Sequence, residues 1–391
     1  MPEYKFTAKS LRLLEEVLSS CRGQRRERAW SVIGPYGSGK STFGLLILQL
    51  LTGAESPWLK QCLRQLEVVN SPLAQQVHTE FQTEKAKYLP IILAGSKLPL
   101  DLALCRALHQ AATDQGQDKS WVSESFLAKL HLALETLDGG ISDSRATLEL
   151  YQQAAQLARI AGYRGLLVAV DEFGKFLERA AWQGDLPDLL AAQYLAKLTS
   201  GSPEPQVLFF VLLHQGIQHY ASSLSRRQWL EWAKIQGRFE QVDFTEDLDN
   251  LYDLIAVSLR QQDWSDKDRA AVNRWAKGVW QQVQDLPVFQ GENAADLWRE
   301  LLPRVYPFHP LALYALPRLS ARLGQNERTV FNFLASDDPL GFKRFLRSTP
   351  KDDIKLPSLT LDYLFDYFLS GSRFALLPRT CSAGSVKLTL P

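Results

Sequence analysis

The feature that most constrains this chain is a glycine-rich octapeptide at residues 34–41, which reads Gly-Pro-Tyr-Gly-Ser-Gly-Lys-Ser. It matches the phosphate-binding loop pattern G-x-x-x-x-G-K-[ST] at every specified position. An apolar run of strand length, residues 29–33, precedes the loop, and a helical segment, residues 42–51, follows it and ends before Gly53. The sequence therefore predicts a strand–loop–helix unit that binds a nucleoside triphosphate.

The loop offers two kinds of contact to a triphosphate. Its glycines let backbone N–H groups turn inward, and the following helix adds the positive end of its dipole. We expect the Lys40 ammonium to reach the β- and γ-phosphates and the Ser41 hydroxyl to bind Mg²⁺. The sequence has no Asn-Lys-x-Asp motif for guanine, so ATP is the expected nucleotide. The predicted nucleotide-binding residues of the loop are Gly34, Pro35, Tyr36, Gly37, Ser38, Gly39, Lys40, Ser41 and Thr42.

Three further apolar runs, residues 88–94, 165–170 and 207–213, alternate with helical patterns. This alternation predicts an α/β fold, a P-loop NTPase parallel sheet with helices on both faces. The strand at 88–94 comes between the P-loop strand and the strand at 165–170. Such an additional strand is typical of the class of P-loop ATPases that carries a second, catalytic acidic residue.

From about residue 245 the pattern becomes predominantly helical, which predicts an all-helical lid domain after the sheet. The tail at residues 371–391 has no helical period, and it suggests a truncated or frame-shifted end. The predicted organisation is an N-terminal helix (1–27), a P-loop ATPase core (28–245), a helical lid domain (246–345) and a C-terminal segment (346–391).

Two carboxylates, Asp171 and Glu172, directly follow the apolar run at 165–170. We expect Asp171 to hold Mg²⁺ through water and Glu172 to polarise the attacking water. An acidic pair after a strand is also a common helix N-cap, and for the pair taken alone both interpretations stay open. The phosphate-binding loop upstream favours the catalytic one.

Four more polar positions are candidates for the catalytic cycle. His214 and Gln215 follow the strand at 207–213, where a polar side chain can contact the γ-phosphate and orient water; ordinary loop polarity is the alternative. Arg238 can reach the nucleotide of a neighbouring subunit, or it is a surface arginine paired within the chain. Arg328 precedes an apolar helix and either senses the γ-phosphate or belongs to a plain helix-start cluster.

The composition argues against several other functions. The formal net charge of +1 gives no overall footprint for nucleic acid, and the short basic cluster at residues 22–28 is expected to be solvated surface. No apolar signal segment or run of membrane-spanning length is present, so we expect a cytoplasmic protein with no membrane partner. The four cysteines lack C-x-x-C spacing, which argues against a zinc site or a disulfide framework.

Taken together, five stretches carry a resemblance to a known group: GPYGSGKST, LLVAVDEFGKFLE, the His-Gln strand end, WAKIQGRFEQVDF and FHPLALYALPRLSARLGQNERTVFNFL. They resemble the AAA-type ATPases of the origin-recognition and STAND branches. Within these, the chain is most similar to the ATPase modules of large bacterial phage-defence proteins of the BREX and phage-growth-limitation kind. The likeness spans roughly residues 28–370.

This resemblance implies Mg²⁺-dependent ATP hydrolysis that drives conformational change in a multi-protein defence system. It implies other subunits of that system as partners, with DNA and a homo-oligomer as further candidates, and it assigns the arginine role to Arg238. The alternative function is a slow nucleotide-gated switch or assembly module that signals through protein partners. A degenerate fragment is a third alternative, raised by the unusual C-terminus.

Overall fold

The computed structural model divides the chain into two compact units, Met1–Glu246 and Asp247–Pro391. The structure describes residues 4–35, 38–81, 87–114, 119–183, 187–201, 206–220, 226–244, 248–259, 264–290, 294–323, 330–349 and 356–369.

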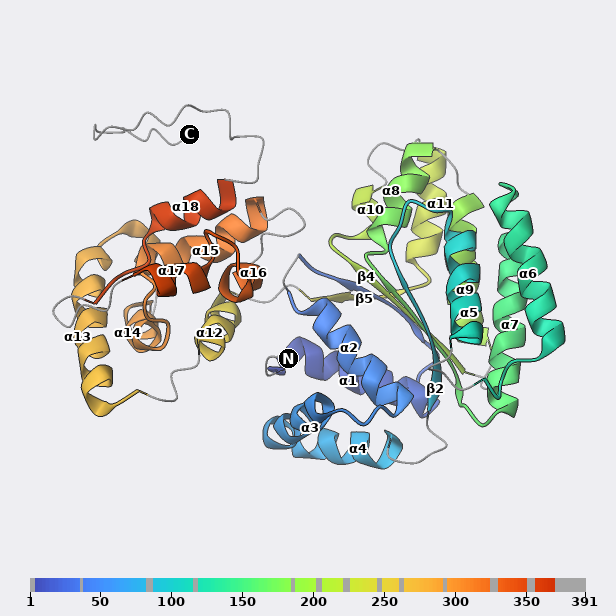
Figure 1. Cartoon of the computed structure of the whole chain (residues 1–391), viewed down its shortest axis with the longest axis horizontal. Coiled ribbons are helices and arrows are strands. Elements are labelled where there is room, and N and C mark those ends of the chain that lie inside the picture. Colours follow the sequence, from blue (N-terminus) through green and yellow to red (C-terminus); the bar gives the residue numbers. More distant parts are fainter. Residues whose placement is uncertain are drawn as a thin grey trace. The chain divides into compact units, whose positions relative to one another are not determined.

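The first unit is built on a five-stranded, all-parallel sheet in the order β2-β3-β4-β1-β5 (Figure 1). Strand β4 pairs with β1 on one side and with β3 on the other, so it lies between the P-loop strand and the acidic strand. Strand β2 lies at the edge of the sheet beside β3. The strands are β1 (Ala29–Ile33), β2 (Tyr88–Ala94), β3 (Gly165–Asp171), β4 (Gln206–Leu213) and β5 (Glu240–Asp243).

Helices cover both faces of this sheet, as the alternating pattern predicts. One core contains Trp30, Leu167 and Phe210 from the sheet and the apolar sides of four helices; the other contains Val168, Phe209 and seven helices. The first set is α1 (Ala8–Cys21), α2 (Lys40–Thr52), α3 (Pro57–Val69) and α4 (Ser71–Phe81). The second set is α5 (Leu100–Thr113), α6 (Glu124–Asp138), α7 (Ser144–Ile160), α8 (Gly174–Gln183), α9 (Pro187–Gly201), α10 (Ile217–Tyr220) and α11 (Arg226–Gln236).

Helix α6 lies in a stretch, residues 114–145, that the sequence pattern leaves without a defined element. Ser123 caps the helix by accepting a hydrogen bond from the Phe126 amide at 3.2 Å. The buried side chains of α6 are Phe126, Leu130 and Leu137, so its apolar stripe is sparse. Because so few apolar residues repeat with the helical period, the sequence gives only a weak signal for this helix. Packing against α5 and α7 stabilises it instead.

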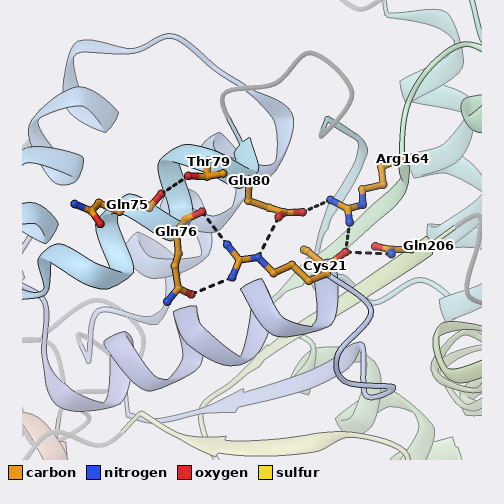
Figure 2. Close-up of polar contacts among 8 residues, drawn as sticks. Cys21, Gln75, Gln76, Thr79, Glu80, Arg164 and Gln206 are labelled. Atoms are coloured by element: carbon orange, nitrogen blue, oxygen red, sulfur yellow. Dashed lines mark hydrogen bonds and ion pairs between the residues drawn. The ribbon is translucent and has the colours of Figure 1, made fainter.

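A polar network joins α1 and α4 to the amino edge of the sheet (Figure 2). Arg164, just before β3, donates to the Glu80 carboxylate and to the carbonyl of Cys21. Arg22 donates to the other oxygen of Glu80 at 3.1 Å, and Gln206 donates to the Cys21 carbonyl at 3.2 Å. One carboxylate thus pairs with two guanidinium groups and connects the end of α1, the end of α4 and the start of β3.

In the described part of the second unit, helices surround one core that is rich in aromatic side chains, and Phe308 and Phe333 are fully buried in it. Phe308 also forms an isolated bridge with Leu359, so the chain returns from α17 to the start of α15. The helices are α12 (Leu248–Ser258), α13 (Asp266–Val283), the 3₁₀ turn η2 (Pro287–Phe289), α14 (Ala294–Arg304), α15 (Pro310–Leu323), α16 (Val330–Ala335), α17 (Phe342–Ser348) and α18 (Leu361–Leu369). Among the described residues of both units, none of the helices combines the length and apolarity that crossing a bilayer demands.

Replacing Glu80 by Gln should lower the free energy of unfolding of the first unit by about 1–3 kcal/mol at neutral pH, because two largely buried guanidinium groups lose their charged acceptor. Burial raises the pKa of Glu80, but the hydrogen bonds from Arg164 and Arg22 outweigh it and hold the pKa below its ordinary value. The stabilisation is therefore complete above the unfolded-state pKa of about 4.3 and is lost as the pH falls below it.

Hydrogen exchange of the sheet amides at pH 7 and near pH 4 measures this difference for the first unit. The matched control is Glu67→Gln on the exposed side of α3. An equal loss of stability in the two variants, or a difference that does not shrink in acid, would contradict the role given to Glu80.

Candidate functional site

The candidate site lies at the carboxyl edge of the sheet, where β1, β4 and β3 end side by side. Because the three strands are parallel and adjacent, Gly34, His214 and Asp171 leave the sheet at the same edge. The Gly34 amide continues the β1–β4 pairing by donating to the Leu213 carbonyl at 3.0 Å. The phosphate-binding loop and the acidic strand end, which are more than a hundred residues apart in sequence, are thereby brought together.

The described part of the phosphate-binding loop is tightly folded. A Cβ on Gly34 would lie 2.8 Å from the Ser38 hydroxyl and 3.1 Å from the Phe244 backbone, so this position has room only for glycine. Gly39 has φ +85° and is the N-cap of α2, a conformation that glycine adopts without strain. Tyr36 and Gly37 lie outside the described residues.

Lys40 begins α2 and is 5% exposed. Its Nζ donates to the carbonyls of Gly34 at 2.6 Å and Pro35 at 2.8 Å, so the ammonium folds back over the loop. Burial lowers the pKa of Lys40 to about 8, and the charge of Asp171 acts in the opposite direction. A largely desolvated cation at a helix amino terminus favours the approach of an anion.

Asp171 is the last residue of β3, and Glu172 follows in a left-handed conformation with φ +51°. The Glu172 amide donates to Asp171 Oδ1 at 2.8 Å, and the Glu172 carboxylate forms an ion pair with Lys175 on α8. Non-glycine residues with positive φ are held there by their surroundings and cluster at functional sites. The surroundings here include Gly95, whose amide donates to the Asp171 carbonyl at 2.7 Å.

The structure brings Ser41 and Asp171, the two predicted metal ligands, to the wall of one cavity of about 180 Å³. Ser41 and Thr42 are exposed in the first turn of α2. Among the described residues, no group of three or more His, Cys, Asp and Glu side chains is placed to hold a metal ion. The rest of the cavity wall is mainly apolar, so the cavity itself is not a metal site. The Ser41 hydroxyl and the Asp171 carboxylate alone are the one or two protein oxygens that Mg²⁺ usually takes, with phosphate oxygens and water completing its shell.

The charges of the candidate site also act on the His214 imidazole. Burial, and after it the charge of the neighbouring Lys40, lower the pKa of His214 to about 4 against the opposing effect of Glu172 and Asp171. The imidazole is therefore neutral at pH 7. Gln215, the next residue, is exposed beyond the end of β4.

Of the two predicted arginines, the structure describes Arg238, which does not join this arrangement. Arg238 is exposed just before β5, and the pairing of Glu240 with Trp30 places it at the amino edge of the sheet, opposite the loop. Its predicted role concerns a neighbouring subunit, and that role stays a prediction. Arg328 lies outside the described residues.

Sequence reasoning overlooked two residues of the site, Gly95 and Lys175. A Cβ on Gly95 would lie 2.0 Å from the carbonyl oxygen of Glu172, so the backbone of the loop after β2 touches the acidic turn. The sequence signal was a glycine directly after an apolar run of strand length. Lys175 lies three residues after Glu172, the spacing of a helical ion pair.

No protein-family model matches the chain, and a search of curated proteins gives no match either. The assignment of a function therefore depends on the sequence motifs and on the geometry of this site.

The close approach at Gly95 yields a prediction about the acidic turn. Gly95→Ala should lower the free energy of unfolding of the first unit by about 1–3 kcal/mol, because the added methyl group forces the turn at Glu172 away from the loop after β2. Gly237→Ala is the control, since its Cβ would lie 3.4 Å from the nearest atom, an ordinary contact. Hydrogen exchange of the β3 amides measures the effect, and two equally stable variants would contradict it.

The lowered pKa of His214 predicts an acid-sensitive first unit. A histidine whose pKa is lower in the folded state favours unfolding as the pH falls from its unfolded pKa of about 6.5 toward its folded value of about 4. His214→Gln should therefore lose less stability than the wild type between pH 7 and pH 5, as measured by hydrogen exchange of the β4 amides. The control is His219→Gln, an exposed histidine on α10; equal acid sensitivity in the wild type and His214→Gln counts against the assignment.

Proposed function

We propose that this chain is a Mg²⁺-dependent ATPase of the additional-strand, catalytic-glutamate class of P-loop NTPases. The observation that carries the proposal is Lys40, a buried ammonium that lies at the start of α2, within the phosphate-binding sequence motif, and within electrostatic range of Asp171. The strand order supports the class, because β4 separates the P-loop strand from the acidic strand.

The proposed roles follow from what each side chain presents at the carboxyl edge. The loop amides and Lys40 bind the phosphates, and in doing so the ammonium exchanges the Gly34 and Pro35 carbonyls for phosphate oxygens. Ser41 and, through water, Asp171 would hold Mg²⁺, and the ion would supply positive charge beside the transferring phosphoryl group. Glu172 orients a water for attack on the γ-phosphate and accepts its proton, while neutral His214 and Gln215 contact that phosphate or the water.

The helical second unit is proposed to be a lid domain whose conformation changes when ATP is bound or hydrolysed. We propose, on the resemblance in sequence, that the chain acts in a bacterial multi-protein system of phage defence, with other subunits as partners and with DNA and a homo-oligomer as candidates. In this proposal Arg238, exposed at the amino edge of the sheet, contacts the nucleotide of a neighbouring subunit in an oligomer, and Arg328 senses the γ-phosphate.

A second candidate function, the slow nucleotide-gated switch, is favoured by one specific contact. The Glu172 carboxylate, which is the proposed base, forms an ion pair with the Lys175 ammonium, and this neighbouring positive charge offsets its negative charge. A carboxylate held in this way orients water less well, which slows hydrolysis without weakening ATP binding. In this alternative the active-site residues are unchanged, and the output is a conformational state that partners recognise.

ATP binding tests the site directly. Lys40→Ala should weaken binding of ATP about 10- to 100-fold, the equivalent of one charge-assisted hydrogen-bonding group. Lys60→Ala on the exposed side of α3 is the control and should bind as the wild type does. Calorimetric titration of MgATP measures both, and equal affinities in the two variants would overturn the assignment of the loop.

Turnover then separates the two candidate functions. Glu172→Gln should lower steady-state phosphate release about 100-fold or more while ATP binding is kept, whereas Glu178→Gln, exposed on α8, should leave phosphate release unchanged. Stimulation of the wild type by double-stranded DNA supports an ATPase that acts on DNA. Tight ATP binding with no turnover in the wild type, with or without DNA, supports the switch instead.

A further inference from the structure

Two histidines outside the candidate site face one another across a pair of helices. His109 of α5 and His131 of α6 have their Nε2 atoms 2.9 Å apart and their ring centroids 4.9 Å apart. His131 is exposed and His109 is half-buried, so solvent reaches the pair. His109 lies nine residues into α5, roughly 14 Å along the helix from the end that follows β2 and the sheet edge.

The positions of the two rings are set by the packing of their helices. The core-facing side of α5 is almost continuously buried, and Phe126, Leu130 and Leu137 anchor α6 beside it. An ion pair of 2.7 Å between Arg106 and Asp138 joins the same two helices. The packing of α5 against α6 therefore sets the distance between the two imidazoles. Little side-chain entropy is lost in holding the rings there, because they are short and rigid.

This separation is the one that a chelated metal ion requires. Two imidazole nitrogens bound at about 2.0–2.1 Å to one ion lie roughly 2.9 Å apart at a right angle and about 3.4 Å apart at a tetrahedral angle. We propose that His109 and His131 form a two-histidine site for a divalent transition metal ion, with Cu²⁺ and Ni²⁺ preferred. The right-angled bite suits the square-planar geometry of these two ions.

Water completes the coordination in this proposal, because no third His, Cys, Asp or Glu side chain joins the pair among the described residues. Burial and the neighbouring His131 lower the pKa of His109, which keeps its ring in the neutral form that ligates metals. In the absence of metal the two nitrogens share one proton as a hydrogen bond. A bound ion replaces that bond with a cross-link between α5 and α6.

The test uses the full chain, freed of any affinity tag, and titrates it with Cu²⁺ or Ni²⁺ alone. His131→Gln is the decisive variant, because an amide can keep the hydrogen bond to His109 but is a much poorer ligand for these ions. His78→Gln, an exposed histidine on α4, is the matched control. Circular dichroism checks that both variants keep the fold.

We expect the wild type and His78→Gln to bind one equivalent of Cu²⁺ with an electron paramagnetic resonance spectrum that shows coupling to two imidazole nitrogens. Loss of one of the two protein ligands should weaken Cu²⁺ binding at least about tenfold in His131→Gln and remove the two-nitrogen signature. Equal binding in His131→Gln and the wild type, or no saturable binding by the wild type up to about 1 mM metal, would show that the pair is only a hydrogen bond.

Discussion

The arrangement of the first unit depends on strand β4. Gln206–Leu213 is buried along its whole length, and its backbone pairs with β1 on one side and β3 on the other. The pairing of β4 with β1 and with β3 brings the phosphate-binding loop and the acidic pair to one edge of the sheet, although the two are far apart along the chain. Because all three strands are parallel, their polar ends must emerge together, where helix amino termini also point. The candidate site is thus a consequence of backbone pairing before any side chain contributes to it.

The charged side chains at this edge of the sheet change one another's pKa values. Lys40 is held in a desolvated position by two loop carbonyls, and its charge, with that of Asp171 and Glu172, sets the environment of His214. Burial lowers the pKa of both Lys40 and His214, because desolvation disfavours the charged form of each by more than the nearby carboxylates favour it. A site of this kind gains most from a polyanion. In the proposed function this positive charge attracts the phosphates, and the Glu172–Lys175 ion pair is the contact that rearranges for hydrolysis.

Much of this could be read from the sequence, and the failures have physical causes. The loop at residues 34–41, the strands and most helices follow from glycine placement and from the period of apolar residues, both of which are local signals. Helix α6 was missed because it buries few side chains. The strand at 88–94 does come between the P-loop and acidic strands along the chain, but the sequence did not show that β2 lies at the edge of the sheet and β4 at its centre. The contact of Gly95 with Glu172, and the opposite-edge position of Arg238, likewise depend on strand order.

The sequence by itself therefore determined which groups the chain presents: a loop with the phosphate-binding pattern, an acidic pair after a buried strand, and helices with one apolar face. These properties are encoded within a few consecutive residues, because glycine conformations, caps and side-chain periods are local. Only the tertiary structure decided which of these elements are neighbours, which cations lose water, and that His109 and His131 meet across two helices. Such contacts join residues far apart in the chain, and they exist only once the sheet order and the helix packing have formed.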